Sequence, residues 1–229
     1  MVDKAAGNFA FTCRKFYFLK LATELGLDNE IPGNDTYEFV QDSEDRVIDR
    51  IKTDMLQFNL RPDEKESKLA LLYHTPKFHK NPPKMRYIAG NVKTVTAKLD
   101  KIVAIAMKMC KGHFRNLCKK NFDFSGIRYC FDVQTSTEVK GMLDLASGNA
   151  HSISINDFST LYTLFDHDHM LGNISWLLGK LSKNSGLYQE RVNHEKAWSV
   201  KGDSEGTVYT IGELLEMTSY VVYSYLGLW

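Results

Sequence analysis

The chain has 229 residues, of which 43% are hydrophobic and 25% charged, with a formal net charge of +1. This composition is typical of a globular protein, and the absence of any run of about 18 apolar residues argues against a membrane-spanning helix and a membrane partner. The N-terminus shows no apolar signal core, and the four cysteines stand far apart without a Cys-x-x-Cys pair. We therefore expect an intracellular protein, in the nucleus or the cytoplasm, with free thiols in a reducing compartment.

Up to residue 58 the sequence predicts one short strand, one loop and two helices. Phe9 and Phe11 alternate with small or polar residues, as in a strand, and Gly26 is a suitable C-terminal stop for the first helix. The second helix is amphipathic, with apolar residues every three or four positions from Val47 to Phe58. The expected ranges are 8–13 for the strand, 15–25 and 43–58 for the helices, and 31–41 for the loop.

Two extended runs, 69–74 and 85–89, flank the proline-rich segment 76–84. We expect a hairpin here, and because proline fixes φ and removes backbone donors, the hairpin should be an edge or protruding element. Basic residues surround its tip: Lys77, Lys80, Lys84 and Arg86. His74 and His79 are expected to be exposed loop residues, with phosphate contact as the alternative.

A long helix is predicted over 97–119, with Thr96 as its N-cap. Apolar residues recur every three or four positions from Leu99 to Leu117 and define one face. A stripe of cations lies elsewhere on the helix: Lys101, Lys108, Lys111, Arg115 and Lys119. The predicted nucleic-acid contacts are Lys77, Lys80, Lys84, Lys101 and Lys108.

The small net charge hides two blocks of opposite sign. Residues 71–120 hold twelve Lys or Arg and one acid, which is a net charge of +11, whereas residues 28–68 hold twelve acids and six bases, a net charge of −6. The basic block also contains interleaved aromatic residues: Tyr73, Phe78, Tyr87 and Phe114. Such a pattern suits a polyanion-binding surface, and a solvated lysine-rich helix face explains the charge alone equally well.

The second half of the chain alternates short extended runs with helices. Thr210 and Glu213 have capping-box spacing before the last helix, and Trp176 and Trp198 are expected in the core. Residues 166–169, Asp-His-Asp-His, have poor spacing for metal ligands on one helix face, and we interpret them as the polar N-terminal turn of a helix. The expected ranges are 127–131 and 153–157 (extended), 188–192 and 197–200 (a hairpin), and 137–145, 170–181 and 211–223 (helices).

A carboxylate marks the end of the predicted strand over 153–157. Ile153 and Ile155 alternate with serines, and the alternation stops at Asp157. A carboxylate that projects past a sheet can hold a hard metal ion, although an aspartate at a strand end is more often a helix cap or a turn former. Tyr162 follows five residues later.

Three blocks carry a resemblance to a known family. Residues 3–11 read Asp-Lys-Ala-Ala-Gly-Asn-Phe-Ala-Phe, residues 72–90 read Leu-Tyr-His-Thr-Pro-Lys-Phe-His-Lys-Asn-Pro-Pro-Lys-Met-Arg-Tyr-Ile-Ala-Gly, and residues 157–163 read Asp-Phe-Ser-Thr-Leu-Tyr-Thr. In these blocks, and more weakly along nearly the whole chain, the sequence resembles the reverse transcriptase of Penelope-like retroelements.

The resemblance implies roles for five residues. Asp157 matches the first metal-binding aspartate of the palm and would hold magnesium, with the backbone carbonyl of Phe158 near the same ion. Tyr162 matches the aromatic steric gate that leaves no room for a 2′-hydroxyl, and Lys4 and Arg86 match finger residues that meet the triphosphate. Phosphoryl transfer itself asks for such preorganised cations, because negative charge builds on the phosphate oxygens.

The implied fold is α+β, a partial right-hand polymerase with mixed helices and short antiparallel strands. Fingers would occupy about 1–135, and an incomplete palm about 136–229. Polymerases of this class hold two magnesium ions with further aspartates on a Tyr-x-Asp-Asp hairpin, and the sequence contains no Asp-Asp pair. We therefore expect the chain to end before that hairpin, to hold at most one partial magnesium site and to be inactive alone.

The implied partners are an RNA or DNA primer–template and a deoxynucleoside triphosphate. The alternative is a non-enzymatic remnant that binds nucleic acid or protein. In that case the apolar segment 220–229 would pair with its own copy, or with a chain that supplies the missing palm and thumb.

Overall fold

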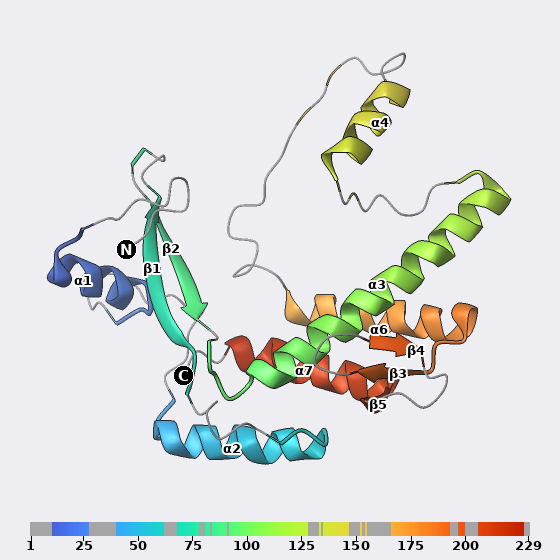
Figure 1. Cartoon of the computed structure of the whole chain (residues 1–229). Coiled ribbons are helices and arrows are strands. Elements are labelled where there is room, and N and C mark those ends of the chain that lie inside the picture. Colours follow the sequence, from blue (N-terminus) through green and yellow to red (C-terminus); the bar gives the residue numbers. More distant parts are fainter. Residues whose placement is uncertain are drawn as a thin grey trace.

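The computed structural model describes residues 11–27, 40–61, 68–77, 81–82, 84–90, 92–127, 133, 135–146, 152, 154, 166–192, 197–199 and 206–226. Within these ranges the protein is a mixed α+β chain with six helices and two small antiparallel sheets (Figure 1). The helices are α1 (Arg14–Glu24), α2 (Glu44–Gln57), α3 (Ala97–Ser125), α4 (Ser136–Ala146), α6 (His167–Ser185) and α7 (Ile211–Leu226). The strands are β1 (Leu71–Lys77), β2 (Lys84–Gly90), β3 (Gln189–Val192), β4 (Ala197–Ser199) and β5 (Thr207–Thr210).

Helix α2 forms where the apolar periodicity predicts it. The Ser43 side chain caps its N-terminus by accepting a hydrogen bond from the Arg46 N–H at 3.4 Å. Val47, Ile51 and Met55, at helical spacing, are all buried, so the predicted apolar face is the buried face.

Helix α3 begins at the predicted residue but extends further, to Ser125, and Gly126 in the left-handed conformation (φ 69°) ends it. At about 1.5 Å per residue, its 29 residues span roughly 43 Å. The predicted cap is wrong in its chemistry, because the Thr96 hydroxyl donates to the Asp100 carboxylate at 3.1 Å and accepts no hydrogen bond from the first turn.

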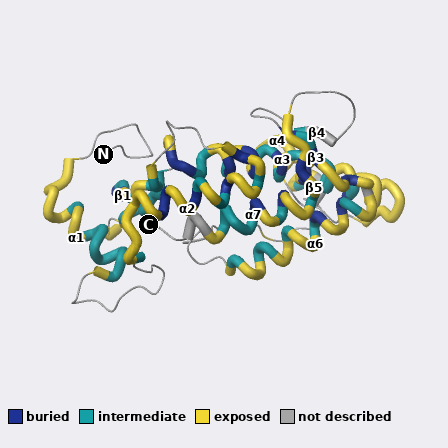
Figure 2. The backbone as a smooth tube through the Cα atoms, turned by 90° about the horizontal axis from the view of Figure 1, so that it is seen from below, coloured by how far each residue is buried: buried dark blue, intermediate teal, exposed yellow. Residues whose placement is uncertain are grey.

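The buried residues gather into two clusters. The larger cluster joins α2, α3, α7, β3 and β5, and includes Met55, Leu99, Tyr209 and Met217. The smaller one joins Cys110 of α3 to three leucines of α6 and the segment after it, namely Leu178, Leu181 and Leu187. Figure 2 shows this buried material along α2, α3 and α7, whereas α1 contains no buried residue.

The second half of the described chain follows the predicted order with one addition. The hairpin β3–β4 is present, and a strand that the sequence analysis did not predict, β5, pairs with the other side of β3. Thr210 and Glu213 form the predicted capping box at the start of α7, with the Glu213 N–H donating to Thr210 Oγ1 at 3.1 Å and the Thr210 N–H donating to Glu213 Oε2 at 2.7 Å.

One tryptophan prediction is wrong. Trp176 is 61% exposed on α6, where Lys180, one turn further, places its ammonium 5.6 Å from the ring centroid. Its neighbour Leu178 faces the core instead. The burial of Trp198 lies outside what the structure describes.

Several other predicted elements fall wholly or partly outside the described ranges. They include the strand expected to end at Asp157, the first part of the strand predicted over 8–13 and most of the extended run over 127–131. The part of the first strand that is described, 11–13, is not a strand. None of the described helices is both long and apolar enough to cross a membrane.

Candidate nucleic-acid interface

The hairpin β1–β2 has two faces that differ in chemistry. The register pairs Lys77 with Lys84, Thr75 with Arg86 and His74 with Tyr87. Because side chains alternate across a strand, His74 and Tyr87 share one face, and the three cations share the other.

The face that carries His74 packs on α1. The His74 ring is fully buried and stacks on Tyr17, with the ring centroids 4.1 Å apart. His74 Nε2 lies 3.0 Å from the Tyr17 carbonyl oxygen, and since a carbonyl only accepts, Nε2 carries the proton. The prediction of an exposed loop histidine is therefore wrong for His74: it is a strand residue that joins the hairpin to α1.

Tyr87 makes a second contact between the hairpin and α1. Its hydroxyl donates to the Lys20 carbonyl oxygen at 3.1 Å, and its ring meets His74 edge-on. Burial, aided by the negative charge of Glu24, raises the pKa of this hydroxyl, so it stays a donor. The two contacts fix which face of the hairpin is turned away from α1.

The outer face of the hairpin carries Lys77, Lys84 and Arg86, together with Tyr73. Lys77 and Lys84 stand directly opposite each other, and Arg86 is the next residue of β2 on this face. No ion pair joins these three cations to a carboxylate within the described residues. Three cations that share one surface, with no carboxylate partner among the described residues, form a candidate binding site for a polyanion. The Tyr73 ring is on the same face but lies near Gly90.

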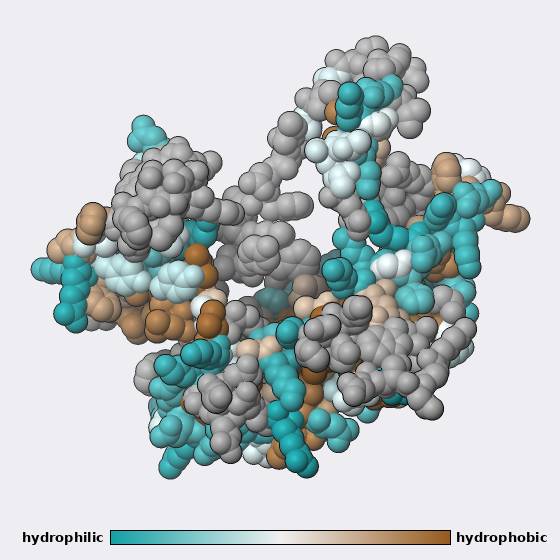
Figure 3. Space-filling model, viewed as in Figure 1, coloured by the Kyte–Doolittle hydropathy of each residue, from teal (hydrophilic) through white to brown (hydrophobic). Residues whose placement is uncertain are grey.

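A second cationic surface runs along α3. Its cations recur at helical spacing, opposite the buried face formed by Leu99, Val103 and Cys110. Lys101 and Lys108 are exposed, and neither makes an ion pair within the described part of the chain. Hydrophilic residues lie over α2 and along α3 in Figure 3. The stripe consists of Lys101, Lys108, Lys111, Arg115 and Lys119.

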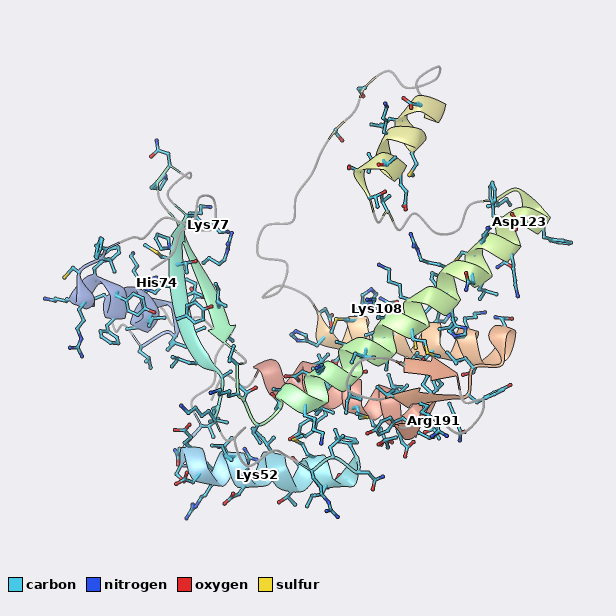
Figure 4. All side chains as sticks on the ribbon, in the orientation of Figure 1. Lys52, His74, Lys77, Lys108, Asp123 and Arg191 are labelled. Atoms are coloured by element: carbon cyan, nitrogen blue, oxygen red, sulfur yellow. The ribbon has the colours of Figure 1, made fainter. Side chains whose placement is uncertain are left out.

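Figure 4 shows how these surfaces lie in the molecule. Lys77 is near the turn end of the hairpin and Lys108 is on the upper side of α3, whereas Lys52 lies on α2 at the opposite side of the view. Near the far end of the stripe, Arg115 contacts Glu138 of α4 at 3.9 Å. Since both side chains are substantially exposed, this pair is weak in water and leaves Arg115 accessible to another anion.

The interpretation of residues 166–169 as a polar helix start is confirmed. The Asp166 side chain accepts a hydrogen bond from the His169 N–H at 3.0 Å and caps α6. The next acid, Asp168, is hydrogen-bonded to the Tyr223 hydroxyl of α7, so both carboxylates are used within the fold.

The structure describes only part of the predicted site. Arg86, Lys77 and Lys84 lie together on the hairpin, and Lys101 and Lys108 lie on α3. Apart from Arg86, the residues expected to hold magnesium and nucleotide lie outside the described ranges: Lys4, Asp157, Phe158 and Tyr162. The predicted nucleic-acid contact Lys80 also lies outside them. Among the described residues, no group of three or more His, Cys, Asp or Glu side chains is placed to hold a metal ion.

One buried polar pair was not predicted from the sequence. Cys110 of α3 donates its thiol hydrogen to Glu190 Oε1 at 3.0 Å, and both side chains are buried. The available signal was the position of Glu190 two residues before Val192 in a predicted strand, which puts a carboxyl on the same face as an apolar residue.

Comparisons with protein-family models, with curated proteins and with solved structures find no match.

Proposed function

We propose that this chain belongs to the RNA-directed DNA polymerases of the Penelope-like kind and that its hairpin and α3 bind nucleic acid. The proposal includes the finer fold assignment, in which α1, β1 and β2 form part of polymerase fingers. The observation that carries it is the outer face of the hairpin, where Lys77, Lys84 and Arg86 meet without a carboxylate partner among the described residues.

Electrostatics explains why such a surface suits nucleic acid. Each lysine or arginine that meets a phosphate releases condensed counterions, and this release favours binding at low salt. Arginine adds a planar fork that can contact two phosphate oxygens, whereas lysine acts as a point charge. Arg86 lies inside the strand and is half-buried, whereas Lys84 is exposed at the strand end, so Arg86 is the better placed of the two for a defined phosphate contact.

The long cationic stripe of α3 supports the same proposal. Lys101 and Lys119 are 18 positions apart, which corresponds to about 27 Å along the helix axis. That length matches several successive phosphates of one strand, so α3 can follow a backbone without reading its sequence. The buried opposite face of α3 keeps the stripe turned outward.

Salt-dependent affinity tests the binding function. A fluorescent primer–template duplex is titrated with the full chain at two salt concentrations. If Lys77, Lys84, Arg86, Lys101 and Lys108 all meet phosphates, the logarithm of the association constant should fall with a slope of about −4.5 per logarithm of salt. Between about 50 mM and 200 mM salt this is a loss of roughly 500-fold. Absence of binding even at low salt would disprove the proposal.

Matched variants locate the interface. Changing Lys77, Lys84 and Arg86 together to alanine should lower the affinity at low salt and make the slope shallower by about 2.7. Lys52→Ala removes one positive charge from α2, away from both cationic surfaces, and should leave the slope unchanged. An equal effect of the α2 variant and of single hairpin variants would show that binding depends on overall charge only.

We further propose that Asp157 and the Phe158 carbonyl meet magnesium, that Lys4 meets the triphosphate and that Tyr162 is the steric gate. We expect no primer extension by this chain alone, since one aspartate cannot clamp two magnesium ions within about 4 Å. Extension with magnesium and deoxynucleotides that survives Asp157→Ala would overturn the assignment of that residue.

A self-association function is the second candidate, and the surface of α7 favours it. Tyr223 is 52% exposed and lines an open groove between α2 and α7, with Phe58 and Tyr220 nearby. The Tyr220 hydroxyl donates to Asp54 at 2.9 Å and the Tyr223 hydroxyl is bonded to Asp168, so both hydroxyls are used within the fold. Tyr223 is the better residue to change because its ring is the more exposed of the two. Light scattering that reports the same monomer mass for the native chain and for Tyr223→Ala would rule out an association through this groove.

A further inference from the structure

Glu190 occupies a core position in the central strand of the β4–β3–β5 sheet. Along β3, Glu190 and Val192 are buried and alternate with the more exposed Gln189 and Arg191. Val192 belongs to the larger core cluster. The strand therefore turns a carboxyl inward at a position where its pattern calls for an apolar side chain.

The hydrogen bonding of this carboxyl is incomplete. Cys110 donates to Oε1 at 3.0 Å, while Oε2 has no hydrogen-bond partner within the described structure. A thiol is a weak donor, so it gives an ionised carboxylate little stabilisation. A buried carboxylate with one weak donor is costly, whereas a neutral carboxylic acid is much less so.

Among the described residues, no cation forms an ion pair or a hydrogen bond with Glu190, and Arg191, the next residue of β3, alternates to the other side of the strand. Tyr209 of β5 and Ser199 of β4 are its register neighbours, and the titratable group that α3 offers is Cys110. His113, one turn along α3, is half-buried and forms no hydrogen bond with Glu190. The buried side chains that α6 packs beside Cys110 are leucines.

The same surroundings decide which group of the pair titrates. Burial raises the pKa of Glu190 to about 7, against an opposing effect of the Cys110 hydrogen bond. Burial, with the nearby Glu190, raises the pKa of the Cys110 thiol far above its usual range. The thiol therefore remains a donor, and Glu190 changes charge near neutral pH.

We propose that Glu190 and Cys110 form a proton-dependent contact that holds the three-stranded sheet on α3. With the proton bound, the carboxyl is a neutral group between the two core clusters. When the proton leaves, an unpaired charge stands in the core, and the contact between β3 and α3 is weakened. Lys101 and Lys108 lie on the opposite face of α3, so loss of the proton weakens the packing of the same helix that carries the cationic stripe.

The sign of the pH dependence follows from the raised pKa. The folded chain holds the Glu190 proton up to about pH 7, whereas the unfolded chain loses it near 4.5. Stability from this group is complete below about pH 4.5 and is lost as the pH rises through about 7. For two such pKa values, the unfolding equilibrium constant should rise about 70-fold between about pH 5 and pH 8.

Denaturant unfolding of the full chain across this pH range tests the proposal. Glu190→Gln keeps the shape and the acceptor for Cys110 but cannot ionise, so the 70-fold change should be missing from its pH profile. Glu216→Gln, an exposed glutamate of α7, should keep the native profile. A Glu190→Gln profile that matches the native one would refute the proposal.

Infrared spectroscopy gives a second test if Glu190→Gln does not fold. At about pH 6, where exposed carboxyls are ionised, the native chain should show the C=O stretch of one protonated carboxyl. Cys110→Ser should shift this band, since a hydroxyl is a stronger donor than a thiol. Absence of a protonated carboxyl from the folded native chain at that pH would equally refute the proposal.

Discussion

At the scale of single residues, the outer face of the hairpin combines binding capacity with a cost to stability. Lys77 and Lys84 are directly opposite each other across the two strands. Like charges in such a pair repel each other, and within the described chain no carboxylate neutralises them. A polyanion would remove this repulsion, so the same pair that weakens the free hairpin favours the bound one.

The residue-scale prediction concerns Lys84→Gln. Removing one of the two facing charges should stabilise the free protein by roughly 0.2–1 kcal/mol, measured by denaturant unfolding at low salt. The same change should weaken duplex binding and reduce the salt slope by about 0.9. Lys52→Gln on α2 serves as the control and should change neither quantity in this direction. A less stable Lys84→Gln protein would contradict the repulsion argument.

Residue roles were harder to predict than residue patterns. His74 lies in a run of basic and aromatic residues, which favours an exposed position, yet it is fully buried, with its ring stacked on Tyr17 of α1, 57 positions earlier. Glu190 and Cys110 are 80 positions apart. The spacing of Glu190 from Val192 indicates the face on which Glu190 lies, but neither contact partner has a local signal, because a distant element supplies it in each case.

At the scale of elements, helix ends and apolar faces were predictable because they depend on local chemistry. The faces of α2 and α3 follow from apolar spacing, and the capping box of α7 follows from Thr210 and Glu213. The hairpin follows from two extended runs around prolines. The strand register is needed to tell which side of the hairpin meets α1. The sequence therefore predicts that Lys77, Lys84 and Arg86 lie near a basic tip, but not that they share one face.

The element-scale prediction compares two helix caps. Thr210→Ala should lower the free energy of unfolding by about 1 kcal/mol, because it breaks the 3.1 Å bond to the Glu213 N–H and leaves Glu213 one acceptor contact fewer. Ser43→Ala should cost less, since its bond to the Arg46 N–H is long, at 3.4 Å, and exposed. Denaturant unfolding of both variants gives the comparison, and a larger loss for Ser43→Ala would contradict it.

At the scale of the whole molecule, the hairpin and α1 are attached to the rest of the described chain differently from the other elements. Neither α1 nor the two strands contributes a buried residue to either core cluster. Links that the structure describes lie just before β1: Lys68 forms a bridge with Thr94 and accepts a hydrogen bond from the Val95 N–H at 3.0 Å, and Leu69 packs against the larger cluster. The hairpin and α1 therefore hold each other mainly through Tyr17, His74 and Tyr87.

This arrangement predicts two levels of stability within one chain. Amide hydrogens of β1, β2 and α1 should exchange faster than those of α3 and α7, because local opening of the hairpin unit exposes few apolar contacts. Hydrogen exchange followed by mass spectrometry measures both regions in the same sample. His74→Ala should speed exchange in α1 and the hairpin and leave α7 unchanged.

Nucleic acid should reverse this order of stability if the hairpin is the interface. Binding to the outer face stabilises the conformation that presents Lys77, Lys84 and Arg86 together, and ligand binding raises apparent stability by mass action. Primer–template duplex at saturating concentration should therefore slow exchange in β1 and β2 more than in α7. In the protein with all three hairpin cations changed to alanine, the duplex should give no such protection. Equal protection of α7 and the hairpin in the native chain would mean that the duplex acts on the whole fold, and would place the binding surface elsewhere.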